Sequence, residues 1–399
     1  MKSKRVADLV FVLVFLLLIV LVTALTVFGP EELTSEYENR YLAKRPVLDP
    51  AIMFDDGYAL EWERYFTDHA AWREPLLMLA TSIDLNIIKR PTVNGIVVLD
   101  DLYLEYLEFT ELDEAWLRQQ SRLMADEMAA LNDVVSSYGG EFFYVAVPTH
   151  ESWYDYKYPW YLNSNKRVSE LTLETFIPDM AAAGVEMVLP FWGLTPEDTF
   201  DGHPLYFTSD HHFSFYGAYM TYRTIIEKIN SSGKNVLPLL ENDDFEFYTL
   251  PNPFMGSHTR KLLNIPDLTE RATIAVLNEA IPFTRSDNGV AFQNHRIYFM
   301  PADADSVIDY GLYMGGDSGE TFIETNRELP SILLFGDSMT NAVECLLYAS
   351  AGEFRSIDLR YYDEMALSEY VEIYKPDIVI CMRGYANLTN FDGNGTVMK

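Results

Sequence analysis

The last third of the chain alternates between segments of strand length and helical segments, and this alternation constrains the fold more than any other feature. Strands are predicted at 331–335, 356–360 and 377–381, and helices at 339–351 and 364–374. Strands that alternate with helices in this way form a parallel sheet covered by helices. The sequence therefore predicts an α/β fold with a central, mostly parallel sheet.

The preceding part of the chain adds further elements to this sheet. The continuously apolar run 142–147 is typical of a strand buried on both faces of a parallel sheet, and Pro148 ends it. Residues 245–300 are rich in β-strand and loop signals and are expected to cover or flank the sheet. The remaining predictions are a strand at 185–189, helices at 51–90, 112–138, 168–184 and 214–231, and a hairpin at 93–104 that turns at Asp100 and Asp101.

The residues from Leu9 to Phe28 form an apolar run that is broken only by two threonines. A helix needs about 20 apolar residues to cross a bilayer, and this run supplies them. The basic residues before it, Lys2, Lys4 and Arg5, are expected to stay in the cytoplasm. The alternative is a cleaved signal peptide, for which 22–24 is the best cleavage site. Both interpretations place the remainder of the chain outside the cytoplasm.

These features suggest a single-pass protein of the cell membrane. We expect a cytoplasmic tail at 1–6, a transmembrane signal anchor at 7–28, a juxtamembrane linker at 29–50 and an extracytoplasmic domain at 51–399. The formal net charge of −31 repels phosphate backbones, which excludes nucleic acid as a partner. The two cysteines, Cys345 and Cys381, have no zinc-site spacing and are expected to be buried thiols, with a single disulfide as the alternative.

A candidate nucleophile follows a predicted buried strand. In Gly336-Asp337-Ser338 the serine lies between this strand and the next helix, at the edge where α/β sheets place their chemistry. Backbone N–H groups of Ser338 and its neighbours are then available to stabilise an oxyanion. The alternative is an ordinary helix cap, which serine favours. The same tripeptide at 316–318 follows no strand and is not favoured as a nucleophile.

A candidate base and carboxylate occur in the segment Asp210-His211-His212, just before a predicted helix. In an extended segment Asp210 and His212 point to the same side, so that the carboxylate can orient His212 towards Ser338, while His211 faces the other way. Two alternatives are a metal site formed by these three residues and a helix start capped by Asp210 or Ser214. We expect no metal and no cofactor.

One part of the sequence resembles the signature of DHHW proteins of Gram-positive bacteria. It consists of residues 210–213, with Phe213 in place of a tryptophan, followed by residues 217–219. Those proteins are similar to the AlgX/AlgJ-type components of alginate O-acetylation, in the SGNH hydrolase superfamily. Further segments fit the resemblance in the same order along the chain: 66–73, 147–148, 313–316, 335–338 and 358–362.

The resemblance implies an SGNH-hydrolase-like three-layer fold and a triad of Asp210, His212 and Ser338. It also implies an O-acetyltransferase or acetylesterase that acts on an extracytoplasmic polysaccharide, together with a membrane-bound O-acyltransferase as a possible partner. The chain departs from the family pattern because it lacks the usual Gly-x-Asn-Asp oxyanion block and has His150 where a lysine is usual. Candidates for the oxyanion or substrate contacts are Asp337, Arg383, Tyr385, Asn387 and His211.

Two other functions are compatible with the sequence. The first is a non-catalytic polysaccharide-binding or assembly protein, for which the aromatic-rich loop 153–161 offers sugar-stacking surfaces. The second is a metal-dependent hydrolase centred on His211 and His212. A serine beyond hydrogen-bond reach of His212 would favour the binding function over catalysis.

Overall fold

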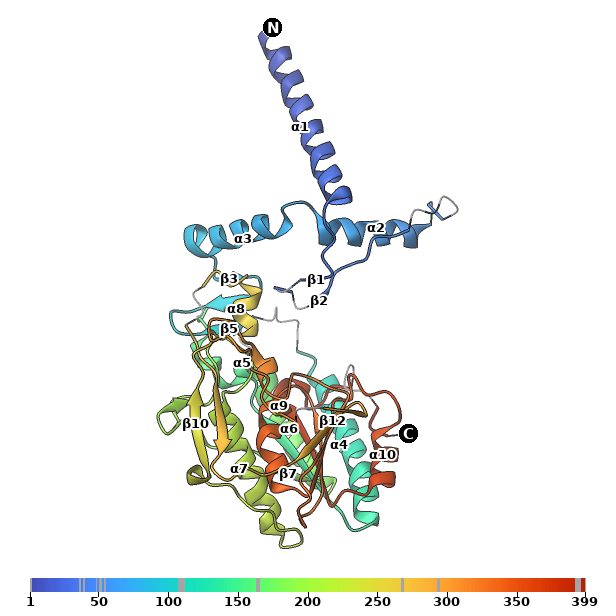
Figure 1. Ribbon diagram of the computed structural model, residues 1–399, viewed down its shortest axis with the longest axis vertical. Coiled ribbons are helices and arrows are strands. Elements are labelled where there is room, and N and C mark those ends of the chain that lie inside the picture. Colours follow the sequence, from blue (N-terminus) through green and yellow to red (C-terminus); the bar gives the residue numbers. More distant parts are fainter. Residues whose placement is uncertain are drawn as a thin grey trace. The chain divides into compact units, whose positions relative to one another are not determined.

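The computed structural model describes residues 2–35, 37–38, 40–47, 49, 52–53, 55–106, 112–162, 166–266, 269–292, 295–391 and 396–398 (Figure 1). The chain forms two compact units, Met1–Asn94 with Arg260–Asp267, and Gly95–Thr259 with Leu268–Lys399. Residues 52–94 thus belong to the unit that contains the N-terminal helix, whereas the sequence suggested a domain that starts at residue 51. The extracytoplasmic domain at 51–399 therefore stays a prediction.

The first unit begins with helix α1 (Lys2–Phe28), drawn in dark blue in Figure 1. Its part Asp8–Phe28 has a mean hydropathy of 3.2, and this is long and apolar enough to cross a membrane. Met1 of the predicted tail lies outside the described residues. The short strands β1 (Thr34–Ser35) and β2 (Arg40–Tyr41) form an antiparallel pair.

Two helices complete the first unit, as the sequence predicts for 51–90. They are α2 (Asp56–His69) and α3 (Arg73–Ile83), which continues as a π-helical turn over Asp84–Ile88 before the short strand β3 (Thr92–Val93). Asp55 caps the start of α2 by accepting a hydrogen bond from the Gly57 N–H. The Asp68 carboxylate, at the end of α2, accepts hydrogen bonds from the Arg40 guanidinium and so ties the helix to β2.

The second unit is built on an eight-stranded sheet with the order β13-β12-β14-β16-β15-β17-β6-β7. The five strands from β16 to β7 are parallel, whereas β14, β12 and β13 extend the sheet in antiparallel fashion. The strands are β6 (Glu141–Val147), β7 (Glu186–Val188), β12 (Thr284–Asp287), β13 (Val290–Ala291), β14 (Glu320–Glu324), β15 (Ile332–Gly336), β16 (Glu353–Ile357) and β17 (Ile378–Gly384). The predicted, mostly parallel sheet is therefore confirmed.

Helices cover both faces of this sheet, because alternate side chains of each buried strand enter two different cores. Phe143 and Val145 of β6 face one core, and Phe142 and Tyr144 face the other. Figure 1 shows α7 on one side of the sheet and α4 and α10 on the other. The first core holds α7 (Phe215–Ser232) and α9 (Thr340–Leu347), and the second holds α4 (Glu114–Ser137), α6 (Lys166–Ala182) and α10 (Leu367–Tyr374).

Shorter elements connect these layers. The predicted hairpin is present as β4 (Ile96–Val98) and β5 (Tyr103–Glu105), and it is closed by a hydrogen bond from the Leu99 N–H to the Leu102 carbonyl. The others are α5 (His150–Trp153), α8 (Ser257–Lys261), the antiparallel pair β8 (Thr199–Phe200) and β9 (His203–Pro204), and the antiparallel pair β10 (Phe245–Thr249) and β11 (Thr273–Leu277).

The structure corrects one prediction and adds a strand. The strand expected at 356–360 lies at Glu353–Ile357, because Asp358 turns the chain by accepting hydrogen bonds from the backbone N–H and the guanidinium of Arg360. Strand β14 was not expected. The prediction for 245–300 is confirmed, because β12 and β13 join the edge of the sheet and β10 and β11 place side chains in the core with α7 and α9.

The two cysteines are free, buried thiols. Cys345 lies in the core with α7 and α9, whereas Cys381 points from β17 into the core with α4, α6 and α10. The sheet therefore separates them, and the alternative of a disulfide between them is wrong.

Candidate active site

Ser338 lies where the sequence places it, at the carboxyl edge of the parallel strands. Strand β15 ends at Gly336, and α9 starts at Thr340. A Cβ atom at Gly336 would lie 1.9 Å from the Met382 carbonyl oxygen, so only glycine lets β15 end this close to β17. This contact fixes the turn that presents Ser338, which is partly exposed.

The Ser338 side chain does not cap α9. The residue that precedes the helix is Met339, and its N–H donates to Asp337 Oδ1 at 3.1 Å. The Ser338 hydroxyl instead lies 2.9 Å from Nε2 of His212, 126 residues away along the chain. The helix-cap interpretation is therefore wrong for Ser338, and its oxygen is within hydrogen-bond reach of a base.

His212 is held on its other side by a buried carboxylate. Asp210 Oδ1 lies 2.5 Å from His212 Nδ1 and also accepts the His212 backbone N–H at 3.0 Å. Asp210 Oδ2 accepts the Ser257 N–H at 2.6 Å. Burial raises the pKa of a carboxyl, but the neighbouring imidazoles and these hydrogen bonds outweigh it and hold the pKa of Asp210 well below its ordinary range. Asp210 is therefore ionised and fixes the His212 ring.

The segment 210–212 is a turn rather than an extended strand. Because Asp210 bonds the backbone N–H two residues ahead, the strict alternation of side chains is lost, and the prediction that His211 faces the other way is wrong. The His211 ring instead lies against His212 with centroids 3.7 Å apart, and its Nδ1 lies 2.8 Å from Ser257 Oγ. The cap of α7 is Ser214, as one alternative proposed.

Two contacts that the sequence did not indicate hold this turn in place. The partly buried carboxylate of Glu270 accepts hydrogen bonds from the N–H and hydroxyl groups of Thr208 and Ser209. A Cβ atom at Gly256 would lie 2.0 Å from the Ser209 carbonyl oxygen, so glycine is needed for Ser257 to reach Asp210. No local sequence signal reveals either contact, because both join segments more than 40 residues apart.

The ring of Tyr310 lies on His212, in a parallel stack with centroids 3.6 Å apart. Tyr310 is buried and starts a 3₁₀ turn over Tyr310–Leu312. No local sequence signal distinguishes it from the other tyrosines, of which the chain has 26 in total. It is an additional residue of the candidate site.

The residues predicted to contact an oxyanion or substrate have different surroundings. Asp337 is buried, and its Oδ2 accepts hydrogen bonds from the Gly384 N–H at 3.0 Å and from Asn387 Nδ2 at 2.9 Å. Arg383 is also buried, and its guanidinium lies 3.8 Å from the Met124 sulfur in the core with α4. Tyr385 packs against this core, and burial raises its pKa to about 12. Their roles towards a substrate stay predictions.

Several backbone N–H groups at the start of α9 already donate hydrogen bonds within the turn and are therefore less available to an oxyanion. The N–H groups of Met339 and Thr340 donate to the side chain and the carbonyl of Asp337, and the Asn341 N–H reaches the Ser338 carbonyl at 3.4 Å. The N–H of Ser338 itself is therefore the leading candidate in this turn.

The second Gly-Asp-Ser tripeptide also lies near α9. Asp317 accepts a hydrogen bond from Asn341 Nδ2 at 3.0 Å and pairs with the Arg360 guanidinium at 2.9 Å. An open hollow beside it is lined by Asn288, Asp317, Ser318, Gly319, Tyr361, Tyr362, Asp363 and Glu364. This hollow offers carboxylates and exposed aromatic surface to a polar ligand.

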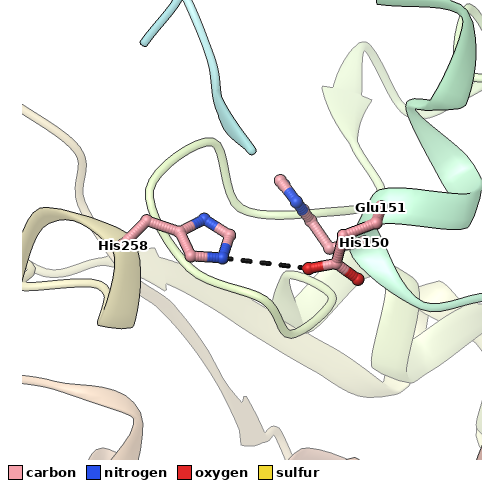
Figure 2. A group of neighbouring side chains, drawn as sticks. All are labelled: His150, Glu151 and His258. Carbon is pink, nitrogen blue, oxygen red and sulfur yellow. Dashed lines mark ion pairs between the residues drawn. The ribbon is translucent and has the colours of Figure 1, made fainter. Parts of the chain in front are cut away.

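Two groups in the described part of the chain could hold a metal ion: Asp210, His211 and His212, and a second group of His150, Glu151 and His258. The first is the group that the sequence singled out. The second, shown in Figure 2, joins α5 to α8 and was not predicted.

Comparison with known proteins adds to the description of the fold. No protein-family model and no curated protein matches the sequence. A structure of Bacillus cereus PatB1 with a sulfonyl adduct is 19% identical, with a TM-score of 0.62 over 76% of this chain and 98% of that chain. A DHHW family protein from Eubacterium siraeum is 20% identical, with a TM-score of 0.57 over 77% of this chain and 98% of that chain. The O-acetyltransferase domain of Pseudomonas putida AlgJ is 13% identical, with a TM-score of 0.44 over 74% of this chain and 92% of that chain.

The first two similarities extend over most of this chain and nearly all of each neighbour. They agree with the central parallel sheet and its two helical layers. The chain therefore has the fold of PatB1 and of the DHHW family protein, which confirms the resemblance that its sequence motifs suggested.

Proposed function

We propose that Ser338, His212 and Asp210 are the catalytic triad of an enzyme that transfers or removes O-acetyl groups on a polysaccharide. The observation that carries the proposal is the 2.9 Å contact between Ser338 Oγ and His212 Nε2, with Asp210 at the other ring nitrogen. This arrangement supports nucleophilic attack because a serine hydroxyl needs a base at hydrogen-bond distance and an oriented imidazole.

The reaction has two half-reactions. In the first, His212 Nε2 takes the hydroxyl proton, Ser338 Oγ attacks the acetyl carbonyl, and the leaving group departs with the proton from His212. In the second, an incoming hydroxyl gives its proton to His212 Nε2 and attacks the carbonyl of the acetyl-serine, and Ser338 Oγ leaves with the proton that His212 returns. A sugar hydroxyl as acceptor gives transfer, and water gives hydrolysis. In both half-reactions the negative charge of Asp210 stabilises the imidazolium.

The Ser338 N–H is proposed to stabilise the oxyanion of each tetrahedral intermediate. Asp337 has a supporting role in this proposal, since its carboxylate bonds Met339, Gly384 and Asn387 and thereby holds the turn that carries Ser338. An ionised carboxylate is an acceptor only and does not itself donate to an oxyanion.

The nucleophile is tested by covalent labelling. The PatB1 neighbour was solved with a sulfonyl adduct, and sulfonylating reagents react with activated hydroxyl groups. We expect phenylmethylsulfonyl fluoride to label the full chain, purified in detergent, at Ser338, with loss of turnover of a chromogenic acetyl ester.

The second Gly-Asp-Ser tripeptide supplies a matched control. Ser338→Ala is expected to abolish both labelling and turnover, whereas Ser318→Ala should leave both unchanged, because the Ser318 hydroxyl donates only to the Glu320 carbonyl among its described contacts. Equal turnover by the wild type and Ser338→Ala would overturn the proposed triad.

The acceptor is tested separately. Acetylated oligosaccharides detected by mass spectrometry after incubation with an acetyl donor would identify a transferase, and acetate release from an acetylated polymer would identify an esterase.

The hollow beside α9 is the proposed place of sugar contact. It contains the exposed Tyr361 and the carboxylate of Asp317, and sugar rings stack on aromatic faces while their hydroxyls donate to carboxylates.

We also propose that α1 anchors the protein in the cell membrane, with the sheet domain outside the cytoplasm and a membrane-bound O-acyltransferase as a partner. The span Asp8–Phe28 supports the anchor. Membrane fractionation with an intact-mass measurement tests it: a full-length chain in the membrane fraction is expected, and a secreted chain that lacks α1 would instead identify a signal peptide.

A second candidate function is polysaccharide binding without catalysis. Trp160 is 94% exposed and forms an edge-to-face pair with the exposed Tyr161, whereas Trp153 and Tyr154 of the same loop are buried. The exposed aromatic side chains of the predicted loop, Tyr156, Trp160 and Tyr161, are therefore the ones available to a sugar. If this function holds, Trp160→Ala lowers retention on immobilised polysaccharide, and Ser338 takes up no sulfonyl label.

A further inference from the structure

His150, Glu151 and His258 form a cluster outside the proposed triad, in which both histidines are buried and Glu151 is partly exposed. His150 and Glu151 begin α5, just after β6 reaches the carboxyl edge of the sheet, and His258 lies in α8. The His258 backbone N–H donates to the Ser209 carbonyl at 3.0 Å, which brings α8 next to the loop before Asp210. Figure 2 shows the His258 ring directed towards the Glu151 carboxylate, with His150 beside it.

The His150 ring has one nitrogen that is already committed. Its Nε2 lies 2.9 Å from the Phe207 carbonyl oxygen, which accepts only from a protonated nitrogen. Its Nδ1 is buried and has no hydrogen-bond partner among the described residues. With the proton on Nε2, the neutral ring carries its lone pair on Nδ1. A buried lone pair without a donor is costly unless something binds it.

The geometry of the cluster suits a small cation. One ligand atom from each residue lies within 4.8 Å of the others, and His258 Nε2 is 4.0 Å from Glu151 Oε1. Ligand atoms around a tetrahedral zinc stand about 3.4 Å apart, given zinc–ligand bonds of about 2.0–2.2 Å. Small side-chain rotations would bring the three atoms to this spacing around an ion.

We propose that this cluster is a Zn²⁺ site, with His150 Nδ1, His258 Nε2 and a Glu151 carboxylate oxygen as ligands. Two imidazoles and one carboxylate are a ligand set that zinc accepts, and they leave a fourth position for water. The Phe207 carbonyl orients His150 by accepting its other N–H, as backbone carbonyls do for metal-bound histidines. The site goes beyond the proposed acetyl chemistry, because none of its ligands belongs to the triad.

The neighbouring group of Asp210, His211 and His212 is less suitable for a metal. Both nitrogens of His212 are engaged, with Asp210 Oδ1 and with Ser338 Oγ. The second Asp210 oxygen accepts the Ser257 N–H. A metal at this group would have to break the hydrogen bonds that form the proposed triad.

The test is metal binding by the full chain, purified in detergent without a histidine tag and stripped with a chelator. After exposure to Zn²⁺ and desalting at neutral pH, plasma mass spectrometry is expected to find one zinc per chain. Co²⁺ in place of Zn²⁺ should give the visible absorption of a four-coordinate site. Competition with a chromophoric chelator then measures the affinity of each variant.

Glu151→Gln keeps the side-chain volume, and His258→Gln removes a ring nitrogen; each is expected to weaken zinc binding at least tenfold. Two other histidine variants are matched controls and should bind zinc as the wild type does. They are His203→Gln, at an exposed histidine that stacks on Tyr216, and His211→Gln. The proposal is overturned if the stripped wild type takes up no zinc, if Glu151→Gln binds it unchanged, or if only His211→Gln loses it. Thermal melting identifies any variant that fails to fold. Zinc uptake by the stripped wild type needs no variant, so a wild type that binds no zinc overturns the proposal even where a variant does not fold.

Discussion

The imidazole of His212 and the phenol ring of Tyr310 lie face to face, with centroids 3.6 Å apart and planes that differ by 1°. Asp210 fixes the rotation of the imidazole in its own plane through Nδ1, and Tyr310 fixes the tilt of that plane. Together the two contacts direct Nε2 at Ser338. The base of the proposed triad is therefore positioned by packing as well as by hydrogen bonding.

The stack predicts a difference between two Tyr310 variants. Tyr310→Phe keeps the ring and is expected to leave kcat within about twofold of the wild type, whereas Tyr310→Leu loses about 0.5–1.5 kcal/mol of ring packing, or about 2–10-fold in kcat. Steady-state kinetics with an acetyl ester measures both. A loss in Tyr310→Phe as large as that in Tyr310→Leu would show that the hydroxyl, and not the ring, matters.

Removal of the Asp210 charge should reduce catalysis severely. In Asp210→Asn the amide can donate a hydrogen bond to His212 Nδ1 and favour the wrong tautomer, so kcat is expected to fall about 10⁴-fold, as in other serine triads. The measurement is kcat with the acetyl ester at neutral pH. Unchanged kcat in a folded Asp210→Asn variant would exclude Asp210 from the triad.

The same carboxylate makes stability depend on pH. Its pKa is lowered in the folded chain from an unfolded value of about 3.9, so the folded state binds fewer protons. The stabilisation is therefore complete above the unfolded pKa and is lost as the pH falls through the lower, folded pKa. We expect the difference in free energy of unfolding between the wild type and Asp210→Asn to be fully present above about pH 4 and to shrink below it. Denaturant titrations at several pH values measure it, and a difference that grows in acid would contradict the assignment.

Glu270 is predicted to support the site from a distance. Its carboxylate accepts from the backbone and side chains of Thr208 and Ser209, and Glu270→Gln replaces one of the accepting oxygens with a donor. The expected result is a loss of about 1–3 kcal/mol of stability and a lower kcat, because the turn at Asp210 loosens. Thermal melting and kinetics measure the two effects. Glu279→Gln, at an exposed position, is the control and should change neither.

The main sheet and the chemical groups of the site could be predicted because their signals are local. The alternating strands and helices of the last third have the expected order, and Ser338 follows a buried strand as predicted. The spacing of Asp210 and His212 indicated a pair, and the structure joins that pair by a hydrogen bond, although through a turn instead of a strand.

The remaining parts of the site depend on contacts between distant segments, which leave no periodic signal. Tyr310, Ser257 and Glu270 reach the turn at 208–212 from other elements. His258 lies 108 residues after His150, and only the folded chain brings the two rings to 5.1 Å. The shift of β16 has a similar origin, since the turn at Asp358 depends on its own side chain bonding the backbone.

The separation of Cys345 and Cys381 by the sheet gives the protein a pair of internal reporters. A thiol reagent reaches Cys345 only when the layer with α7 and α9 opens, and reaches Cys381 only when the layer with α4, α6 and α10 opens. The modification rates of the two thiols under native conditions therefore measure the opening free energy of each layer separately. Because no disulfide joins the two layers, unequal modification rates would show that one layer opens more readily than the other.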